Sequence, residues 1–363
     1  MEYEVDFLPV GEESKGGDAI ALRIWNPSEG FSSQFVMVID GGTKNAGEAL
    51  VEHIKKYYDT EDVDVVLATH CHSDHTSGLS VVLEKLKVKS LYMHKPWEHS
   101  ENITNLFKSD RVTGNSLEIA LKKSLETTRT LESIAKKKGI PIIEPFSDGA
   151  DLEKSFVVLS PSVEYYRSLL PNFAGTPEPK ESASISQKVI SVAKEAINWI
   201  RETWGKETLT DPEENDTSSE NNSSVILLLQ VGDRKLLFTA DAGVGTFNKA
   251  FEKGASLGLD FSSVNYIQVP HHGSKRNIGP TILNALVGPI LSEKKHIKTA
   301  YLSAPKKGEP KHPSGKVINA FKRRGAEVFA TKGVALRHRS DGAPEREGRK
   351  KASPVSFYDE VAE

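Results

Sequence analysis

With 363 residues, the chain is long enough to bury a large core, either as one large domain or as two ordinary ones. Its 37% hydrophobic and 27% charged residues are typical of a soluble globular protein, and its net charge of −3 gives no overall signal for nucleic-acid binding. No stretch approaches twenty apolar residues, no signal peptide is recognisable, and Cys71 is the only cysteine, so we expect a cytoplasmic protein without membrane segments or an internal disulfide.

The first hundred residues alternate between strand and helix patterns, which favours a mixed sheet covered by helices. Strands are indicated by alternating apolar and polar residues or by short apolar runs, and helices by apolar residues three or four positions apart. The expected strands are 5–10, 19–25, 34–39, 63–68 and 89–93, and the expected helices are 46–57 and a short one after Gly78.

Residues from about 95 to 206 are predicted to be mostly helical, and we interpret them as an insertion. It could cap a site or bind a protein partner or a second copy of the chain. Short strands are expected within it near 140–143 and 156–160, and apolar spacing over 189–204 predicts a helix that covers a core. The polar stretch 207–224 is predicted to be a flexible loop.

Strand and helix patterns resume after residue 224, so residues 1–340 are expected to form one domain. A tail at 341–363 follows, basic at first and then acidic. Residues 305–351 contain fourteen Lys and Arg against five Asp and Glu, which could attract phosphates or could form a solvated tail. The expected strands are 225–231, 235–239, 264–269, 299–303 and 326–330, and the expected helices are 245–253, 280–287 and 314–324.

Three histidines and one carboxylate lie within six residues, directly after the strand 63–68. These are His70, His72, Asp74 and His75. Packed together without a metal, these groups would repel and desolvate one another, and a solvated polar loop is the alternative. Neutral imidazoles and a carboxylate suit divalent zinc, manganese or iron. The loop therefore predicts a metal site, with Cys71 expected to point into the core instead of ligating.

Three other predicted strand ends carry polar residues. Asp40 precedes two glycines and Asp241 follows the strand 235–239, and each could be a turn residue when taken alone. His271 and His272 follow the strand 264–269. An adjacent pair cannot place both imidazoles on one metal without strain. We therefore expect one to ligate, with His271 favoured because it comes first, and the other to stabilise the site or contact substrate.

The spacing His-x-His-x-Asp-His resembles the metal loop of the metallo-β-lactamase superfamily. The resemblance implies an αββα sandwich of two mixed sheets with outer helices and a site for two divalent metals. His70 and His72 would serve the first metal, and Asp74 and His75 the second. It also implies that Asp241 bridges the two metals and that Asp40 braces the loop without binding metal.

Further segments resemble the hydrolase domain of ComEC-type DNA-uptake proteins, over residues 1–340 apart from the insertion. The channel's membrane segments are absent from the sequence. The resemblance implies a free-standing hydrolase that acts on phosphodiesters, possible substrates being DNA or RNA. The segments are Gly17-Asp18-Ala19-Ile20, Asn222-Ser223-Ser224-Val225, Val269-Pro270-His271-His272-Gly273-Ser274-Lys275 and His312-Pro313-Ser314.

One departure from the superfamily concerns the first metal, which usually receives a third histidine from a loop before the bridging aspartate. No histidine occurs here between His99 and His271. His94 and His99 are possible substitutes, but packed or surface roles are favoured for both. We therefore expect a weakly held first metal, and a site richer in oxygen would favour manganese over zinc.

In the expected mechanism, two metals lower the pKa of a bridging water, and the resulting hydroxide attacks phosphorus. Asp74 or Asp241 could orient this nucleophile. His312 could protonate or stabilise the leaving oxygen, although a surface position at a helix entry is as plausible. Lys275 and Lys311 could hold a substrate phosphate, with His272 and Ser274 in supporting or substrate-contacting positions.

Three functions follow from these features. A metal-dependent phosphodiesterase, most simply a nuclease, is favoured by the ComEC-like segments and the basic C-terminal region. A hydrolase of small molecules, such as cyclic nucleotides, phosphoesters, lactones or thioesters, would be favoured if the helical insertion closes the site to polymers. A non-catalytic metal-binding or assembly protein would explain the missing third histidine.

Overall fold

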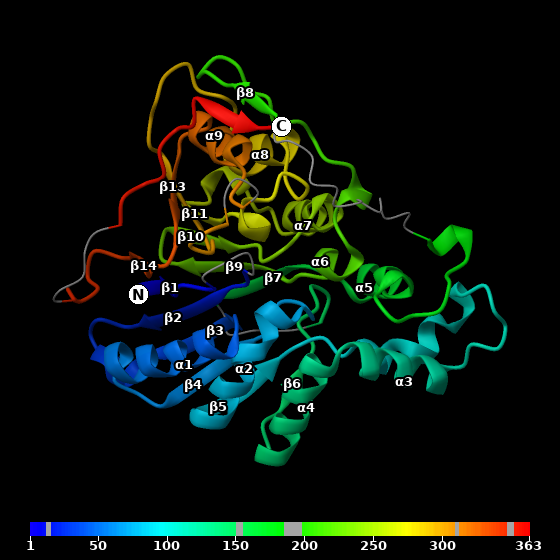
Figure 1. Ribbon diagram of the computed structural model, residues 1–363. Helices are drawn as coiled ribbons and strands as arrows, with labels where there is room; N and C mark the ends of the chain where they lie inside the picture. The colour runs from blue at the N-terminus through cyan, green and yellow to red at the C-terminus, as the bar shows by residue number, and fades with distance from the viewer. Residues whose placement is uncertain (12–15, 150–154, 185–197, 309–311, 347–351) are drawn as a thin grey trace.

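The computed structural model describes residues 1–363 except 12–15, 150–154, 185–197, 309–311 and 347–351. Two mixed β-sheets lie in the middle of the molecule, with helices on the outer side of each (Figure 1). The αββα arrangement expected from the sequence is therefore confirmed. In the described part of the chain, no helix combines the length and the apolar character needed to cross a membrane.

The first sheet has seven strands in the order β14-β1-β2-β3-β4-β5-β6. Strands β3 to β6 run parallel, and β1, β2 and β14 add an antiparallel edge. Helices α1 and α2 pack against the face of this sheet that is turned away from the second sheet, and α4 packs against α2. The bounds are β1 Glu2–Phe7, β2 Ala19–Trp25, β3 Phe35–Gly41, β4 Asp62–Leu67, β5 Lys87–Tyr92, β6 Ile142–Ile143, β14 Leu336–Arg339, α1 Lys44–His53, α2 Ser73–Lys85 and α4 Glu126–Lys138.

The second sheet has six strands in the order β13-β12-β11-β10-β9-β7. Here β10 to β13 run parallel, while β9 pairs antiparallel with β10 and β7. Helices α7, α8 and α9 lie above it in Figure 1. The bounds are β7 Phe156–Ser160, β9 Ile226–Val231, β10 Arg234–Phe238, β11 Tyr266–Gln268, β12 Lys298–Leu302, β13 Ala326–Ala330, α7 Val244–Ser256, α8 Pro280–Leu286 and α9 Gly315–Arg323.

The facing sides of the two sheets form one apolar core. Phe7 of the first sheet packs edge-on against Tyr301 and Tyr266 of the second, with ring centroids 5.9 and 6.4 Å apart. Period-two alternation places such residues on the inner face of each strand. Each buried aromatic or aliphatic side chain contributes about 1.5–3 kcal/mol. This core therefore holds the ends of the strands from both sheets together at one edge.

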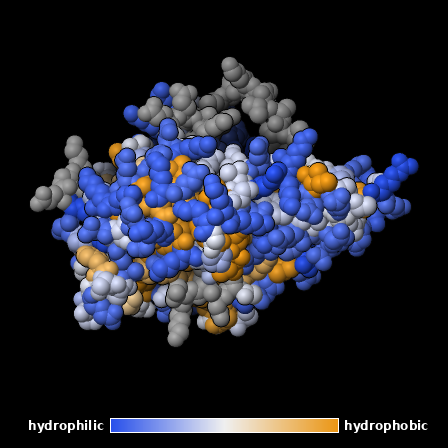
Figure 2. All heavy atoms as spheres, turned by 90° about the horizontal axis from the view of Figure 1, so that it is seen from below, coloured by the Kyte–Doolittle hydropathy of each residue, from blue (hydrophilic) through white to orange (hydrophobic). Residues whose placement is uncertain are grey.

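The outer faces carry the hydrophilic surface. The view from below shows a mostly hydrophilic face with hydrophobic side chains gathered near its centre (Figure 2). The helices on this side bury one apolar stripe each, as Leu131 and Ala135 do on α4, and expose their charged residues.

Residues 95–206 combine helices with two strands that belong to the main sheets. The expected strands near 140–143 and 156–160 are present as β6 and β7. The helix expected over 189–204 falls mainly outside the described residues. Where it is described it is wrong, because β8 lies there and pairs antiparallel with β15 near the C-terminus. The bounds are α3 Gly114–Ser124, α5 Val163–Leu169, β8 Trp199–Arg201 and β15 Glu360–Ala362, with a 3-10 segment at Pro96–Leu106.

Residues 207–224 were expected to be a flexible loop, and the structure differs. They run over the second sheet and end in a short helix, α6 Ser219–Asn222, whose residues are all buried. Glu207 pairs with Arg324 at 2.6 Å, and Asp211 accepts from the hydroxyl of Thr281 at 2.7 Å. The polar side chains that suggested a loop are therefore the ones that hold the segment in place.

The C-terminal segment also differs from a solvated tail. Arg346 forms ion pairs with the buried carboxylates of Asp6 at 2.8 Å and Glu4 at 2.9 Å. Residues 360–362 add β15 to β8. Charge composition alone could not reveal these partners, because they come from the opposite end of the chain.

Candidate metal centre

The predicted metal loop connects β4 to α2 at the edge where the strands of both sheets end. His72 is the N-cap of α2, so Asp74 and His75 lie in its first turn. The helix begins earlier than expected, and Gly78 lies inside it. A Cβ atom at Gly78 would lie 1.9 Å from the carbonyl oxygen of Gly41, so glycine lets α2 pack directly against the end of β3. This close packing positions the loop.

Four overlapping groups of three ligand-capable side chains lie here among the described residues, and Asp241, which follows β10, belongs to two of them. The groups are His70, His72 and Asp241; Asp74, His75 and His272; Asp18, His75 and Asp241; and Asp40, His70 and His75. In the first, ligand-capable atoms of His70, His72 and Asp241 all lie within 4.8 Å of one another. His70 Nε2 is 3.2 Å from His72 Nδ1 and 3.8 Å from Asp241 Oδ2. Two imidazole nitrogens and one carboxylate oxygen form a suitable three-donor set for a divalent cation.

The second group consists of Asp74, His75 and His272, again within 4.8 Å. His75 Nε2 is 3.5 Å from Asp241 Oδ1, and His272 Nε2 is 3.9 Å from the same oxygen. Asp241 therefore turns one carboxylate oxygen toward each group. Only an anionic oxygen ligand can lie between two cations and reduce their repulsion, so this position suits a bridging carboxylate.

His271 and His272 have separate surroundings. His272 shares the group of Asp74 and His75, whereas His271 belongs to none of the four three-residue groups among the described residues. Instead, His271 Nε2 lies 3.4 Å from Asp241 Oδ2, and its Nδ1 is 2.8 Å from Asn277 Oδ1. Both histidines have positive φ angles, 44° and 54°. This strained turn sends the adjacent imidazoles to opposite oxygens of one carboxylate.

Asp40 lies behind the loop, as the superfamily resemblance implies. Its buried carboxylate accepts hydrogen bonds from the backbone N–H of Thr69 at 2.9 Å and from the Thr69 hydroxyl at 2.6 Å. It is also 2.7 Å from Nδ1 of His75. A carboxylate on Nδ1 fixes the ring and leaves Nε2 directed at Asp241, an arrangement typical of metal-binding histidines.

Asp18 is a site residue that sequence reasoning did not select. It is buried, accepts from Ser303 Oγ at 2.5 Å and from Gln268 Nε2 at 2.9 Å, and lies 3.9 Å from His75. Burial, reinforced by the charge of Asp241, raises its pKa to about 6. The available signal in the sequence was the segment Gly17-Asp18-Ala19-Ile20, one of those that resemble the ComEC-type hydrolase domain. In the structure Gly17 has a φ of 99° and lies against Asp74.

The buried imidazoles and carboxylates of the centre shift one another's pKa values. Burial alone would raise the pKa of Asp241, but the imidazoles of His271 and His75 outweigh it and hold this pKa well below its usual range. Burial would lower the pKa of His75, but Asp241 and Asp40 raise it well above the usual range. Burial and the neighbouring His75 lower the pKa of His70. Cation binding here must therefore displace protons.

Two ligand atoms give a direct test of whether the residues fit a metal. His75 Nε2 and Asp241 Oδ1 are buried and face one another as an ion pair at 3.5 Å, and neither atom makes a hydrogen bond of normal length to another described residue. Buried polar atoms without partners are costly, at about 1–3 kcal/mol each. A divalent cation between the imidazole and the carboxylate would satisfy both. The donor set therefore fits a divalent metal at this position, in agreement with the metal site expected from the sequence.

The remaining predicted residues lie beside the centre. The ring of His312 stacks on His271 with centroids 5.9 Å apart. Burial, followed by the nearby His271, lowers its pKa to about 4. Ser274 is buried and its hydroxyl accepts from the backbone N–H of Arg276 at 3.3 Å. Lys275 is exposed at the rim, and Lys311 lies outside the described residues.

His94 and His99 do not reach the metal groups. The ring of His94 lies between those of Phe146 and Tyr166, with both centroid distances 4.5 Å. His99 Nε2 is 3.1 Å from Glu144, and its Nδ1 accepts from Arg167. Both histidines are therefore packed residues, and neither replaces the missing third histidine.

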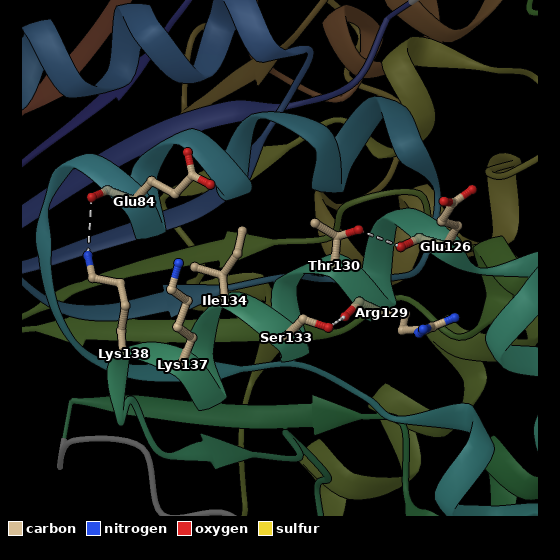
Figure 3. A pocket seen from close by; sticks show the side chains of 8 residues that line it. All are labelled: Glu84, Glu126, Arg129, Thr130, Ser133, Ile134, Lys137 and Lys138. Carbon is tan, nitrogen blue, oxygen red and sulfur yellow. Dashed lines mark hydrogen bonds between the residues drawn. The ribbon is translucent and has the colours of Figure 1, made fainter.

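Two surface grooves follow α4, away from the metal groups, with volumes of about 530 and 510 Å³. Figure 3 shows the first, between α2 and α4, where Lys138 donates to a backbone carbonyl at Glu84. Neither groove is lined by any of the histidines or aspartates of the centre. The chemistry of this protein is therefore assigned to the strand ends and not to these grooves.

Comparison with known proteins agrees with this geometry. Residues 32–146, about a third of the chain, match the family described as the Metallo-beta-lactamase superfamily. The matched stretch begins just before β3 and runs past α4. It includes Asp40 and the complete metal loop.

Two curated relatives match with 28% identity each. "ComE operon protein 3" of Bacillus subtilis aligns over 163 residues, which are 42% of this chain and 19% of that protein. "Probable metallo-hydrolase MJ0888" of Methanocaldococcus jannaschii aligns over 110 residues, 30% of this chain and 50% of that protein. The chain thus spans half or less of the length of these relatives.

Solved structures with partial similarity include a mutant of CmlA β-hydroxylase and the metallo-β-lactamase SMB-1 bound to 2-mercaptoethanesulfonate. The first has 12% identity and a TM-score of 0.42, covering 94% of this chain and 54% of that one. The second has 11% identity and a TM-score of 0.27, covering 77% and 87%. At these TM-scores the superpositions support no conclusion about function.

Proposed function

We propose that the protein is a divalent-metal-dependent phosphodiesterase, and specifically a nuclease. The observation that carries this proposal is the position of Asp241, which presents one carboxylate oxygen to each of two histidine-containing groups. Paired sites of this kind stabilise both the attacking and the leaving oxygen of a displacement at phosphorus. The metallo-hydrolase relative and the superfamily domain support hydrolysis as the reaction class.

In this proposal, His70, His72 and Asp241 hold one cation, and Asp74, His75, His272 and Asp241 hold the other. Bound there, zinc or manganese would supply Lewis-acid stabilisation of phosphate oxygens and would lower the pKa of water. Hydrogen bonds from neighbouring groups orient the ligand side chains. The Nδ1 atoms of His75 and His272 are paired with Asp40 and with the carbonyl of Ser303, so Nε2 is the nitrogen that each ring offers to a cation. Nε2 of His272 accepts a hydrogen bond from the backbone N–H of Gly17 at 3.1 Å, which a bound cation would replace.

Two further residues act on the substrate side in the proposed reaction. His312 is neutral near pH 7, because burial lowers its pKa to about 4, and a neutral imidazole offers an N–H to the leaving oxygen. Its Nδ1 atom is buried and has no hydrogen-bond partner in the structure. Asp74, which is only partly buried, can orient the attacking water.

The choice of a phosphodiester rests on similarity to ComE operon protein 3 and on cations at the rim of the centre. A small-molecule hydrolase is the second candidate. It is favoured by the depth of the centre, where His70, His75 and Asp241 are at most 3% exposed. A cytoplasmic location remains part of the proposal, because a free thiol such as Cys71 is typical of reducing compartments.

The test is digestion of end-labelled single- and double-stranded DNA and RNA with added manganese or zinc, with Asp241→Ala alongside. Cleavage by the wild type and none by the variant is the expected result. If the wild type cleaves no nucleic acid but hydrolyses a cyclic nucleotide, lactone or thioester, the small-molecule hydrolase replaces the nuclease. Equal cleavage by both proteins would mean that another site or a contaminant is responsible.

A further inference from the structure

Asp18 connects the two sheets beside the metal centre. It lies directly before β2 of the first sheet, yet both oxygens of its carboxylate accept hydrogen bonds from residues at strand ends of the second sheet. Oδ1 accepts from the hydroxyl of Ser303 at 2.5 Å, and Oδ2 accepts from the side-chain amide of Gln268 at 2.9 Å. Figure 1 shows β2 in the lower sheet and β11, which ends at Gln268, in the upper one. This carboxylate therefore joins the two sheets at the edge where the ligands lie.

Gln268 links Asp18 to the turn that carries Asp241. The side-chain oxygen of Gln268 accepts hydrogen bonds from the backbone N–H groups of Thr239 and Ala240, at 3.0 and 3.1 Å. Ala240 directly precedes Asp241 and has a φ of 46°, a conformation that residues with a side chain rarely adopt. Such a backbone persists only where its surroundings hold it. Because Asp18 binds the amide nitrogen of Gln268, the amide oxygen is directed at the turn and holds it.

Ser303 links Asp18 to His272 in a similar way. The Ser303 hydroxyl binds Asp18, and the Ser303 backbone carbonyl lies 3.1 Å from Nδ1 of His272. The residue before Asp18 lies between the two sides of the centre. A Cβ atom at Gly17 would lie 1.8 Å from the carbonyl oxygen of Asp74, while the N–H of Gly17 donates to Nε2 of His272 at 3.1 Å. Asp18 is therefore anchored where ligands that follow strands of the first sheet meet ligands that follow strands of the second.

The burial of Asp18 has an energetic cost that its bonds to the second sheet offset. Asp18 is 2% exposed, and a buried carboxylate is unfavourable unless it is hydrogen-bonded. Apolar contact between the sheets is non-directional, whereas a charged acceptor requires its donors at about 3 Å and in line with it. The bonds of Asp18 therefore fix the relative position of the two sheets more narrowly than the apolar core does.

We propose that Asp18 is a positioning residue of the metal centre, which sets through its hydrogen bonds where Asp241 and His272 lie relative to His75. The inference rests on the cations of the proposed function and not on the choice of substrate. Because His75 and His272 share a ligand group, the cation held there depends most on Asp18. Asp18 also shares a ligand-capable group with His75 and Asp241, so direct ligation is the competing role that the test must separate.

The test compares two substitutions of Asp18 in the full chain, with zinc affinity measured by competition against a fluorescent chelator. Asp18→Ala removes both acceptors, and the affinity should fall about 10–100-fold, as it does when partners behind metal ligands are removed. Asp18→Asn should return the affinity to near the wild-type value. Its amide oxygen accepts from Gln268, and its amide nitrogen donates to the hydroxyl of Ser303, which can accept as well as donate. A neutral amide does not replace an anionic metal ligand, so this rescue is specific to positioning.

Gln268→Met keeps the length of the side chain but removes its bonds to Asp18 and to the turn. It should lower zinc affinity as well, and it keeps the test open if Asp18→Ala fails to fold. Asp260→Ala is the matched control, because Asp260 also accepts from a backbone N–H and a hydroxyl, both of Ser262, but precedes β11 and takes no part in the ligand groups. Leu121→Ala, at a buried position on α3, controls for destabilisation alone. Both controls should bind zinc as the wild type does.

The positioning role and the proposed function fail in different ways. Wild-type affinity in a folded Asp18→Ala variant would overturn the positioning role and leave the nuclease. A loss in Asp18→Asn as large as in Asp18→Ala would also overturn it, in favour of direct ligation. A wild type that binds zinc and responds to the Asp18 variants as expected, but cleaves no phosphodiester, would remove the nuclease and leave the positioning role. A wild type that binds neither zinc nor manganese would overturn both.

Discussion

The carboxylate of Asp40 lies 2.7 Å from Nδ1 of His75, and both side chains are fully buried. Asp40 is also bonded to Thr69 at the start of the metal loop, so one carboxylate fixes both the loop and the ring. The opposite nitrogen of His75 then faces Asp241. The metal centre therefore depends on a residue that takes no part in the groups around Asp241.

Asp40→Asn keeps the shape of this side chain but removes its charge. We expect the affinity for zinc or manganese to fall about 10–100-fold, since partners behind metal-binding histidines contribute this much. Competition against a fluorescent chelator measures the effect. Asp62→Asn, at an exposed strand start, provides a control with the same chemical change. Unchanged affinity in Asp40→Asn would show that the 2.7 Å contact does not orient the ligand.

Asp241→Ala should abolish both metal occupancy and hydrolysis while the fold is retained, because the side chain connects the two groups and lies outside the apolar core. Mass spectrometry measures the metal content of the variant, and circular dichroism shows whether its fold is retained. A folded variant that still holds two metals and remains active would refute the bridging role.

His272→Ala should lose one of the two metals, whereas His271→Ala should retain both. The reason is that His272 shares a group with Asp74 and His75, and His271 does not. The measurement is the number of metal ions bound per molecule of each purified variant. The reverse result would favour the expectation from the sequence, in which His271 ligates.

His94→Phe should make the protein less sensitive to acid. Burial lowers the folded-state pKa of His94 from 6.5 to about 3, so the unfolded chain takes up the proton first as the pH falls. The stability contributed by the neutral ring is complete above about pH 6.5 and is lost towards pH 3. Between pH 7 and 5, the variant should lose about 2 kcal/mol less than the wild type in urea unfolding. If the variant and the wild type lose the same free energy of unfolding between pH 7 and 5, His94 is not buried in the neutral form. His296→Gln, at an exposed position, is the control.

Gly78→Ala should destabilise the fold by about 1–3 kcal/mol, because the new Cβ would overlap backbone atoms of Gly41 and push α2 away from β3. Metal affinity should fall as well, since the same packing positions the loop. Gly205→Ala adds a Cβ in open space and should change stability by less than about 0.5 kcal/mol. Equal unfolding midpoints for the two variants would count against the close packing of α2.

Most strands could be predicted because their apolar alternation is local, and β2 coincides with the expected 19–25. The gathering of the metal loop, Asp241 and the histidine pair could also be predicted, because parallel strands bring their ends to one edge. Which oxygen of Asp241 each of His271 and His272 faces could not be predicted, because it depends on positive φ angles in the turn.

Other features depend on partners that are distant in sequence. Asp18 resembles an ordinary turn residue until Ser303 and Gln268 are placed beside it. Likewise, β8 exists because β15, about 160 residues later, pairs with it, and no local pattern encodes such a pairing. The helical spacing over 189–204 therefore predicted a helix where the structure has the strand β8.

The two halves of the chain divide the ligands of the centre between them. His70, His72, Asp74 and His75 lie after β4 of the first sheet or in α2, while Asp241 and His272 follow strands of the second. A chain still being synthesised, with its second half inside the ribosome, holds only one side of the ligand set. Metal can be captured with full affinity only after the two sheets have docked, so bound metal is a marker of completed assembly.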